Sequence, residues 1–247
     1  MSIVRFQKTD LAPQSPPAEG AQRKIVIAVD GPAASGKGTL AKTMAARLGY
    51  AYLDTGALYR AVALATLEMG GDPGKIEDVS PALSIVKRNL TPELLANPAL
   101  RTPAVSQAAS LVAALPEVRI DLLDYQRAFA ENPPGAVGGV VLDGRDIGTV
   151  VCPRADIKFF VTASAKERAQ RRYKELQKLY PHLTLEQVLE DIRQRDQRDA
   201  SRKAAPSFAA DDAHILDTTE LSPADVLEEA IQTVRAKFLA VSENNHN

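Results

Sequence analysis

The sequence has little of several features that define other classes of protein. Its 247 residues include a single cysteine, Cys152, which excludes an internal disulfide and a cysteine-based zinc cluster. It has no tryptophan, and aromatic residues make up 5% of the chain, so there are few platforms on which nucleic-acid bases could stack. Neither sign of charge dominates, because 30 Lys and Arg residues stand against 31 Asp and Glu residues. We therefore expect no nucleic-acid or membrane partner.

Long apolar runs are also absent, since the longest of them, such as residues 25–29, have the length of a strand. The start, MSIVRFQKTD, carries charges where a signal peptide needs an apolar run, so a cytoplasmic protein is expected. Residues 1–22 are rich in Pro, Gln, Ser and Ala without any periodic pattern, which predicts a flexible leader. Residues 242–247 are predicted to form a flexible tail for the same reason.

What is present from residue 24 onward is an alternation of short β-branched runs and longer amphipathic stretches. This pattern is typical of the α/β class, in which crossover helices join parallel strands. The predicted strands cover residues 24–30, 51–54, 140–144, 157–163 and 214–218. Helices are predicted to begin after three N-cap residues, Ser164, Thr184 and Ser222. At this length a single core with inserted lobes is favoured over several domains.

Two regions interrupt the alternation within a single domain expected over residues 23–241. Residues 68–102 are rich in Pro and Gly, which predicts an inserted lobe of short and often broken helices. Residues 172–205 form a highly charged helical pair around Pro181, which suggests a lid. The core is expected to comprise residues 23–67, 103–171 and 206–241.

The strongest single signal is a glycine-rich loop between an apolar strand and an amphipathic helix. Backbone N–H groups of such a loop, the N-terminal end of the helix and a lysine together bind the phosphates of a nucleotide. The generic pattern places Ser or Thr directly after the lysine, whereas here Gly38 intervenes and the hydroxyl comes at Thr39. A site for ATP or GTP is therefore predicted, with the loop formed by Gly31, Pro32, Ala33, Ala34, Ser35, Gly36, Lys37, Gly38 and Thr39.

Two further groups of charged residues suggest an anionic ligand. Arg195, Arg198 and Arg202 are spaced to share one helical face, where they could point at a polyphosphate. Alternatively, this is a solvated face on which Asp191 and Asp199, four residues either side of Arg195, pair with it. A second group, Asp143, Arg145 and Asp146, follows an apolar strand at the carboxyl end, where α/β sheets bind their ligands.

These motifs together resemble those of bacterial-type cytidylate kinases. The resemblance rests on GKGT at 36–39, DTGALYR at 54–60, DGRDIGT at 143–149 and RDQRD at 195–199 followed by Arg202, and it covers about residues 24–240. It implies a P-loop three-layer sandwich with a central five-stranded parallel sheet, a monophosphate-binding lobe and a helical lid. It further implies a monomer that transfers a phosphoryl group from ATP, with Mg²⁺, to CMP or dCMP.

The resemblance also assigns roles to residues. Lys37 would bridge the donor phosphates, Arg145 and Arg60 would hold the acceptor phosphate, and Arg195 and Arg202 would close over the transferring group. The residues implied in catalysis are thus Lys37, Arg145, Asp146, Arg195 and Arg202. Those implied in substrate binding are Thr55, Arg60, Ser110, Arg119, Asp143, Arg145, Asp146, Arg195 and Arg202.

Some of these assignments leave alternatives open. The cytosine amino group needs an acceptor, which could be the Ser110 hydroxyl or an aspartate, because Arg119 can only donate. Asp146 could face the sugar or orient neighbouring arginines. Arg171 matches a donor-side position, with Arg168 and Arg172 as close rivals. Thr39 and Asp143 are the candidates for Mg²⁺.

Two other functions are compatible with a P-loop. One is a kinase for another small acceptor, such as UMP, AMP or a metabolite hydroxyl. A hydroxyl acceptor would need a general base, and Asp146 is the best candidate. A nucleotide-dependent switch would need no arginine cluster, and the sequence has no NKxD-type segment for reading guanine. The three histidines, His182, His214 and His246, have no catalytic partners nearby in sequence and are expected to be structural or at the surface.

Overall fold

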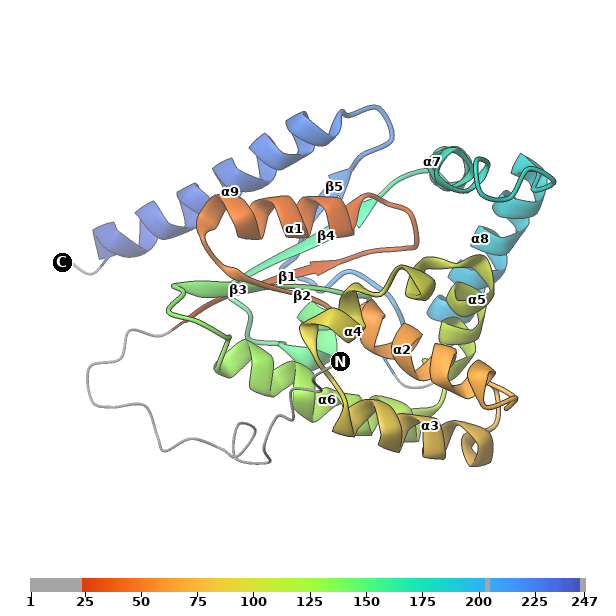
Figure 1. The fold of residues 1–247 in the computed structure, drawn as a ribbon. Helices are drawn as coiled ribbons and strands as arrows, with labels where there is room; N and C mark the ends of the chain where they lie inside the picture. The colour runs from red at the N-terminus through yellow and green to blue at the C-terminus, as the bar shows by residue number, and fades with distance from the viewer. Residues whose placement is uncertain (1–23, 203–204, 245–247) are drawn as a thin grey trace.

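The computed structural model describes residues 24–202 and 205–244, with side chains up to residue 238, so the predicted leader and His246 lie outside the described residues. Five parallel strands form one sheet: β1 (Ile25–Asp30), β2 (Ala51–Asp54), β3 (Gly139–Asp143), β4 (Ile157–Thr162) and β5 (His214–Asp217). Their order across the sheet is β2-β3-β1-β4-β5 (Figure 1). The predicted α/β class with a central parallel sheet is thus confirmed.

Helices cover both faces of this sheet. On one face, α1 (Lys37–Leu48) and α9 (Pro223–Asn244) pack on Ile27, Val29 and Val141. On the other, α6 (Pro116–Glu131) and a π-helical turn, η3 (Ile147–Val151), pack on alternate strand residues such as Ala28 and Leu142. The α9 helix extends three residues into the segment 242–247 for which a flexible tail is predicted.

A lobe of helices lies beside the sheet (Figure 1). It contains α2 (Thr55–Glu68), α3 (Ile76–Arg88), α4 (Pro92–Ala96), η2 (Pro98–Arg101) and α5 (Pro103–Val112). A cluster of buried side chains, including Leu58, Leu83 and Leu122, joins α2, α3 and α5 to α6.

The expectation that prolines break the helices between residues 68 and 102 is wrong for Pro81, which lies inside the 13-residue helix α3. Pro81 and Glu77 are both exposed, so the Glu77 carbonyl that loses its partner can bond to water. Pro92 and Pro98 instead begin their helices, where a missing N–H has no cost.

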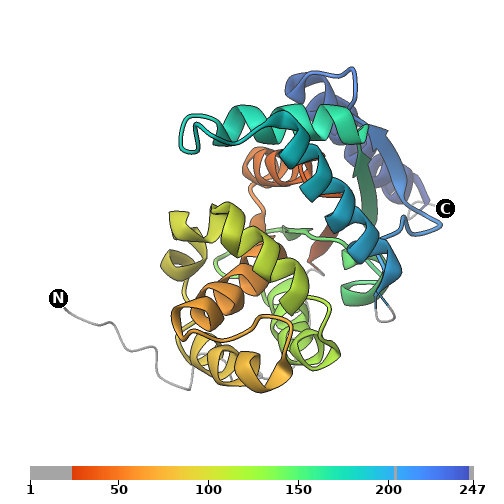
Figure 2. The ribbon, with the colours of Figure 1, turned by 90° about the vertical axis from the view of Figure 1, so that its right-hand side faces the viewer.

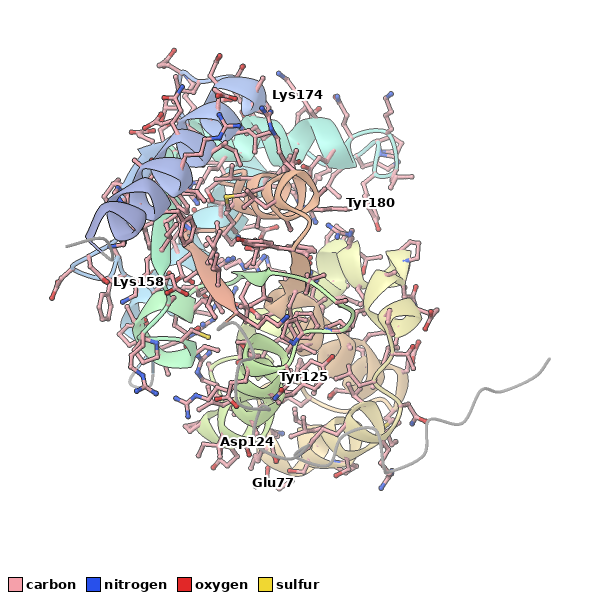
Figure 3. All side chains as sticks on the ribbon, turned by 90° about the vertical axis from the view of Figure 1, so that its left-hand side faces the viewer. Glu77, Asp124, Tyr125, Lys158, Lys174 and Tyr180 are labelled. Atoms are coloured by element: carbon pink, nitrogen blue, oxygen red, sulfur yellow. The ribbon has the colours of Figure 1, made fainter. Side chains whose placement is uncertain are left out.

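A helical hairpin, α7 (Ala165–Leu176) and α8 (Leu185–Ser201), lies on the same side of the molecule as α5 (Figures 1 and 2). Ser164 and Thr184 cap these helices as predicted, and Thr184 with Gln187 forms a full capping box. The hairpin touches the helical lobe, because Arg198 Nη2 donates to Gln107 Oε1 at 2.8 Å. Figure 3 shows Lys174 of α7 and Glu77 of α3 at opposite ends of the molecule.

No helix in residues 24–202 or 205–244 combines the length and apolar character needed to cross a bilayer.

Candidate functional site

A cavity of about 1700 Å³ opens at the carboxyl edge of the sheet. The last residues of β1, β2 and β3 are Asp30, Asp54 and Asp143, and the register pairs Asp54 with Asp143. The residues predicted from the sequence converge here: all of them line the cavity except Gly31 and Pro32. Those that do so are Ala33, Ala34, Ser35, Gly36, Lys37, Gly38, Thr39, Thr55, Arg60, Ser110, Arg119, Asp143, Arg145, Asp146, Arg171, Arg195 and Arg202.

The glycine-rich loop has the conformation of an anion-binding turn. Ala34 has a φ of 58° and Gly36 a φ of 88°, so left-handed residues alternate with others before α1 begins at Lys37. Gly31 is required by packing, because a Cβ there would lie 2.0 Å from the Val161 carbonyl oxygen of β4. The loop is therefore fixed against the sheet on one side and open to the cavity on the other.

Gly38 is also required by packing. A Cβ at this position would lie 2.9 Å from Asp143 Oδ2. That oxygen also accepts a long hydrogen bond of 3.4 Å from the Tyr52 hydroxyl. The departure from the generic Lys-Ser/Thr pattern thus makes room for a carboxylate from β3.

Lys37 and Asp143 face each other in the cavity, with 3.9 Å between Lys37 Nζ and Asp143 Oδ1. Burial, and then the charge of Arg145, lower the pKa of Lys37 to about 8. Burial raises the pKa of Asp143, which the charge of Lys37 opposes. Both groups are thus short of opposite charge, and a phosphate with a cation would satisfy both.

Asp199 of α8 organises two of the predicted arginines. Arg145 Nε donates to its Oδ2 at 2.9 Å, and Arg202 donates to its Oδ1. Burial alone would raise the pKa of Asp199, but Arg145, Arg202 and Arg195 together bring it below its ordinary value. Asp199 is therefore an ionised carboxylate that holds two guanidinium groups at the cavity wall.

Arg195 differs from these arginines, because it makes no hydrogen bond or ion pair among the described residues. Its Nε is buried without a partner, and burial together with Arg145 lowers its pKa. Asp191 and Asp199 do not pair with it, contrary to the alternative of a solvated ionic face. Arg198 lies outside the cavity and bonds to Gln107, so Arg195, Arg198 and Arg202 do not converge on one ligand.

Ser110, Arg119 and Asp146 form the wall beneath α5. Asp146 accepts from Arg119, whose guanidinium carbon also lies 5.7 Å from the centre of the Tyr59 ring. The Ser110 hydroxyl is buried and has no partner in the chain. Of the two alternatives for Asp146, the contact with Arg119 supports the orienting one.

Asp54, Thr55 and Arg60 lie where β2 meets α2. Asp54 caps α2 by accepting from Ala57 N at 3.1 Å, and it also binds Arg60 Nη2 at 2.6 Å. Thr55 Oγ1 donates to the Asp143 carbonyl oxygen at 2.8 Å. Thr55 therefore joins β2 to the loop after β3, while the buried Nε of Arg60 remains unpartnered.

The opposite end of the cavity is built around Thr218, which follows β5. Arg171 donates to the hydroxyl and carbonyl of Thr218, and the hydroxyl is 3.0 Å from the carbonyl oxygen of Ser35. Its rival Arg168 is buried against Asp196, and Arg172 donates to the Arg101 carbonyl oxygen. Arg168 also reaches the loop, because its Nη1 donates to the Ala33 carbonyl oxygen at 3.2 Å, whereas Arg171 alone of the three contacts Thr218.

Unsatisfied polar atoms are concentrated in this cavity. Six of the eight buried side-chain nitrogen and oxygen atoms that lack a partner in the described part of the chain belong to residues that line it: Ser35, Arg60, Ser110, Asp143, Arg195 and Arg202. Buried polar groups in native proteins almost always have partners. Their concentration here indicates a polar ligand with both donors and acceptors.

Several functional contacts were not predicted from the sequence. The spacing of Asp199 indicates only a pairing with Arg195, and no motif indicates a role for Thr218, Tyr52 or Asp30. Their only signal is position, since Asp30 and Thr218 stand at or just after strand ends. His182 and His214 are exposed and do not line the cavity, as expected.

The sheet, the phosphate loop and the arginine-lined cavity define a P-loop phosphotransferase. A family model described as cytidylate kinase matches residues 27–236, and the chain belongs to this family. It is 51% identical over 212 residues to a cytidylate kinase of Rhodopseudomonas palustris (strain BisB18), covering 86% of this chain and 96% of the relative. A cytidylate kinase of Rhodospirillum rubrum is 49% identical over 213 residues, covering 86% and 98%.

Among solved structures, an uncharacterized protein from Eubacterium ventriosum has a TM-score of 0.52 at 11% identity, covering 86% of this chain and 99% of that protein. At this identity the likeness concerns the fold alone.

Proposed function

We propose that this protein transfers the γ-phosphoryl group of ATP to CMP or dCMP and so produces ADP with CDP or dCDP. The observation that carries the proposal is the set of unpartnered buried groups around Lys37, Arg145 and Arg195. The charge of Arg145 lowers the pKa of both Lys37 and Arg195, so these three cations require a concentrated negative charge between them. Two nucleotides that meet at a transferring phosphoryl group supply that charge.

The donor lies along the phosphate loop. Backbone N–H groups of residues 33–39 and the N-terminal end of α1 surround its phosphates, and Lys37 bridges them. Arg171 supports the donor from the side of Thr218. The nearby residues Leu221, Pro223 and Ala224 also line the cavity and offer an apolar surface for the adenine ring.

The acceptor lies under α5 and the inserted lobe expected at residues 68–102. Arg60 and Arg145 hold its phosphate, whereas Ser110 and Arg119 contact the base. Asp146 keeps Arg119 in place. A phosphate acceptor is already ionised at neutral pH, so the transfer needs positioning and cancellation of charge and no general base.

This chemistry weakens the alternative of a hydroxyl acceptor. Asp146 is the best candidate base for such a reaction, but its carboxylate is bound by Arg119. None of the described histidines lines the cavity, so none could replace Asp146 as the base.

Closure of the lid formed by residues 172–205 completes the site. Arg195 and Arg202, from α8 and its end, stabilise the charge that develops on the transferring group. A closed lid also excludes water, which limits the hydrolysis of ATP.

Magnesium fits the residues present. Asp143 Oδ1 is a buried carboxylate oxygen with no hydrogen-bond donor, and it faces the phosphate loop. No cluster of three or more histidine, cysteine, aspartate or glutamate ligands occurs in the described residues, which suits an ion that arrives with its nucleotide. Asp143 and Thr39 would hold Mg²⁺, which when bound neutralises charge on the donor phosphates.

The protein is further proposed to act as a monomer in the cytoplasm. The absence of any possible internal disulfide in the sequence supports a reducing compartment.

A coupled assay of ADP release tests the proposal. ATP and Mg²⁺ are supplied with CMP, dCMP, UMP, AMP or GMP, with shikimate as a control for hydroxyl acceptors. The rate should be highest with CMP and dCMP. ADP release that no acceptor raises above the ATP-only background would overturn the proposal.

A further inference from the structure

Asp30 has a carboxylate that the reaction described above does not use. It is the last residue of β1 and directly precedes Gly31, so its backbone begins the phosphate loop. Asp30 is 4% exposed. The two carboxylate oxygens accept from the backbone N–H groups of Ile147, at 2.8 Å, and Gly148, at 2.7 Å.

This arrangement is costly for a carboxylate. No cation pairs with Asp30 among the described residues, and its only hydrogen-bond donors are these two backbone groups. Lys158 packs its chain against Gly148, but its Nζ bonds to the Pro153 carbonyl oxygen and to Asp212. Figure 3 labels Lys158 on its strand. Burial of a charge without a counterion costs free energy. We therefore expect the two hydrogen bonds of Asp30 to have a function.

The two N–H groups belong to the turn that follows the acceptor-side residues. Ile147 and Gly148 directly follow Arg145 and Asp146 in the chain. The turn is a single π-helical turn, closed by hydrogen bonds from Val150 and Val151 to the Asp146 carbonyl oxygen. A turn of this kind is uncommon and has little intrinsic stability, so its position depends on external contacts.

We propose that Asp30 is a positioning residue that fixes the acceptor-side segment of Arg145 and Asp146 relative to the phosphate loop. One residue thus belongs to both sides of the cavity: its backbone enters the donor loop, and its carboxylate holds the acceptor segment. The proposal rests on the proposed function, which identifies the acceptor side as the site of CMP.

The variant Asp30→Asn tests this. Asn nearly preserves the shape, but its amide group faces one of the two N–H donors, so one hydrogen bond is lost and two donors oppose each other. The KM for CMP should rise at least tenfold. The Kd for ATP, measured by calorimetry without CMP, should stay within twofold of the wild type.

Asp156→Asn is the matched control. Asp156 Oδ2 accepts from the backbone N–H of Val26 at 2.8 Å, at the other end of β1, and Asp156 does not line the cavity. This variant also disturbs a carboxylate bound to backbone, but it should leave the KM for CMP and the Kd for ATP within twofold. If Asp30 had a purely structural role, Asp30→Asn and Asp156→Asn would have similar effects on the KM for CMP and the Kd for ATP.

Two results would overturn the proposal: an unchanged KM for CMP in folded Asp30→Asn, or equal losses in affinity for ATP and CMP. If Asp30→Asn does not fold, Gly148→Ala tests the contact from its other side. The new Cβ would lie 3.4 Å from Asp30 Oδ2 and 3.0 Å from Lys158 Cδ. It should raise the KM for CMP about threefold with no change in ATP affinity, and a KM within error of the wild type would contradict the proposal.

The activity of the wild type distinguishes a failure of the proposed function from a failure of the role proposed for Asp30. A wild type that does not phosphorylate CMP means that the proposed function is wrong. A wild type that does, together with variants that show no selective effect on CMP, means that only the role of Asp30 is wrong.

Discussion

Arg195 is the arginine of the cavity that forms no ion pair with an acidic side chain in the described part of the chain. A carboxylate partner compensates part of the positive charge of four other arginines, Arg60, Arg119, Arg145 and Arg202. The positive charge of Arg195 is therefore the most fully available to a transferring phosphoryl group. At the scale of single residues, this difference predicts the largest loss on its removal.

Arg195→Ala should lower kcat by about a hundredfold or more, the effect typical of a lost contact to transition-state charge. Arg193→Ala is its control, because Arg193 is an exposed arginine of the same helix. Its kcat should stay within twofold of the wild type. Steady-state kinetics with CMP measures both, and similar rates for the two variants would leave Arg195 without a catalytic role.

Asp30 predicts a pH dependence of stability. Burial raises the pKa of its carboxyl to about 7 from an ordinary value of 3.8, against the effect of the hydrogen bonds from Gly148 and Ile147. Between these values the folded chain holds a proton that the unfolded chain has released, so stability falls as pH rises. The free energy of unfolding of the wild type should thus fall relative to Asp30→Asn by about 1.4 kcal/mol per pH unit.

Urea unfolding between pH 5 and 8 measures that difference. The slope should be present between pH 5 and 6.5 and should flatten toward pH 8. A difference between the two proteins that does not vary with pH would mean that the Asp30 carboxyl titrates normally.

Motifs predicted the residues of the cavity well, because adjacent residues such as Gly36 and Lys37 carry their chemistry in the local spacing. Contacts between distant segments were not predictable. Asp199 holds Arg145 across 54 positions, and Thr218 meets Ser35 across 183. A single sequence contains no signal for such pairs, so the hydrogen bond between Asp199 and Arg145 is visible only in the structure.

At the scale of elements, helix starts were the most predictable feature. The hydroxyl of Thr184 accepts from Gln187 N, and the Gln187 side chain accepts from Thr184 N. These bonds satisfy N–H groups that have no partner within the helix. The capping-box spacing of Thr184 and Gln187 therefore has a direct physical cause. The π-helical turn at Ile147–Val151 has no such local pattern and was not predicted.

Thr184→Ala should weaken the first turn of α8 by about 1 kcal/mol. Hydrogen exchange of the amides in that turn should therefore be about fivefold faster. Ser164→Ala is the control, because Ser164 caps α7 in a similar way. It should leave exchange in α8 unchanged, and equal effects of the two variants on α8 would contradict a local capping role.

At the scale of the whole molecule, the strand order creates the site. β3 lies between β1 and β2, so the loop after β3 enters the cavity directly beside the phosphate loop. Ligands of α/β proteins bind where strands diverge in this way. The α/β class could be predicted from apolar periodicity, but the order of strands could not, because it is set by the packing of long crossovers.

The single thiol provides a test of the folded molecule. Burial raises the pKa of Cys152 to about 11. At pH 7.5 the native chain should react with a disulfide reagent at least about 100-fold more slowly than the urea-unfolded chain, because the thiolate is the reactive species. Reaction at equal rates would show that Cys152 is not held in the packed environment of residues such as Val151 and Leu142.

The fate of the γ-phosphoryl group tests the central claim most directly. ATP labelled with ³²P at the γ position is incubated with the protein, Mg²⁺ and CMP, and the products are separated by chromatography. The label should appear in CDP, with one ADP formed for each labelled CDP. Label recovered as inorganic phosphate, with CMP unchanged, would contradict it.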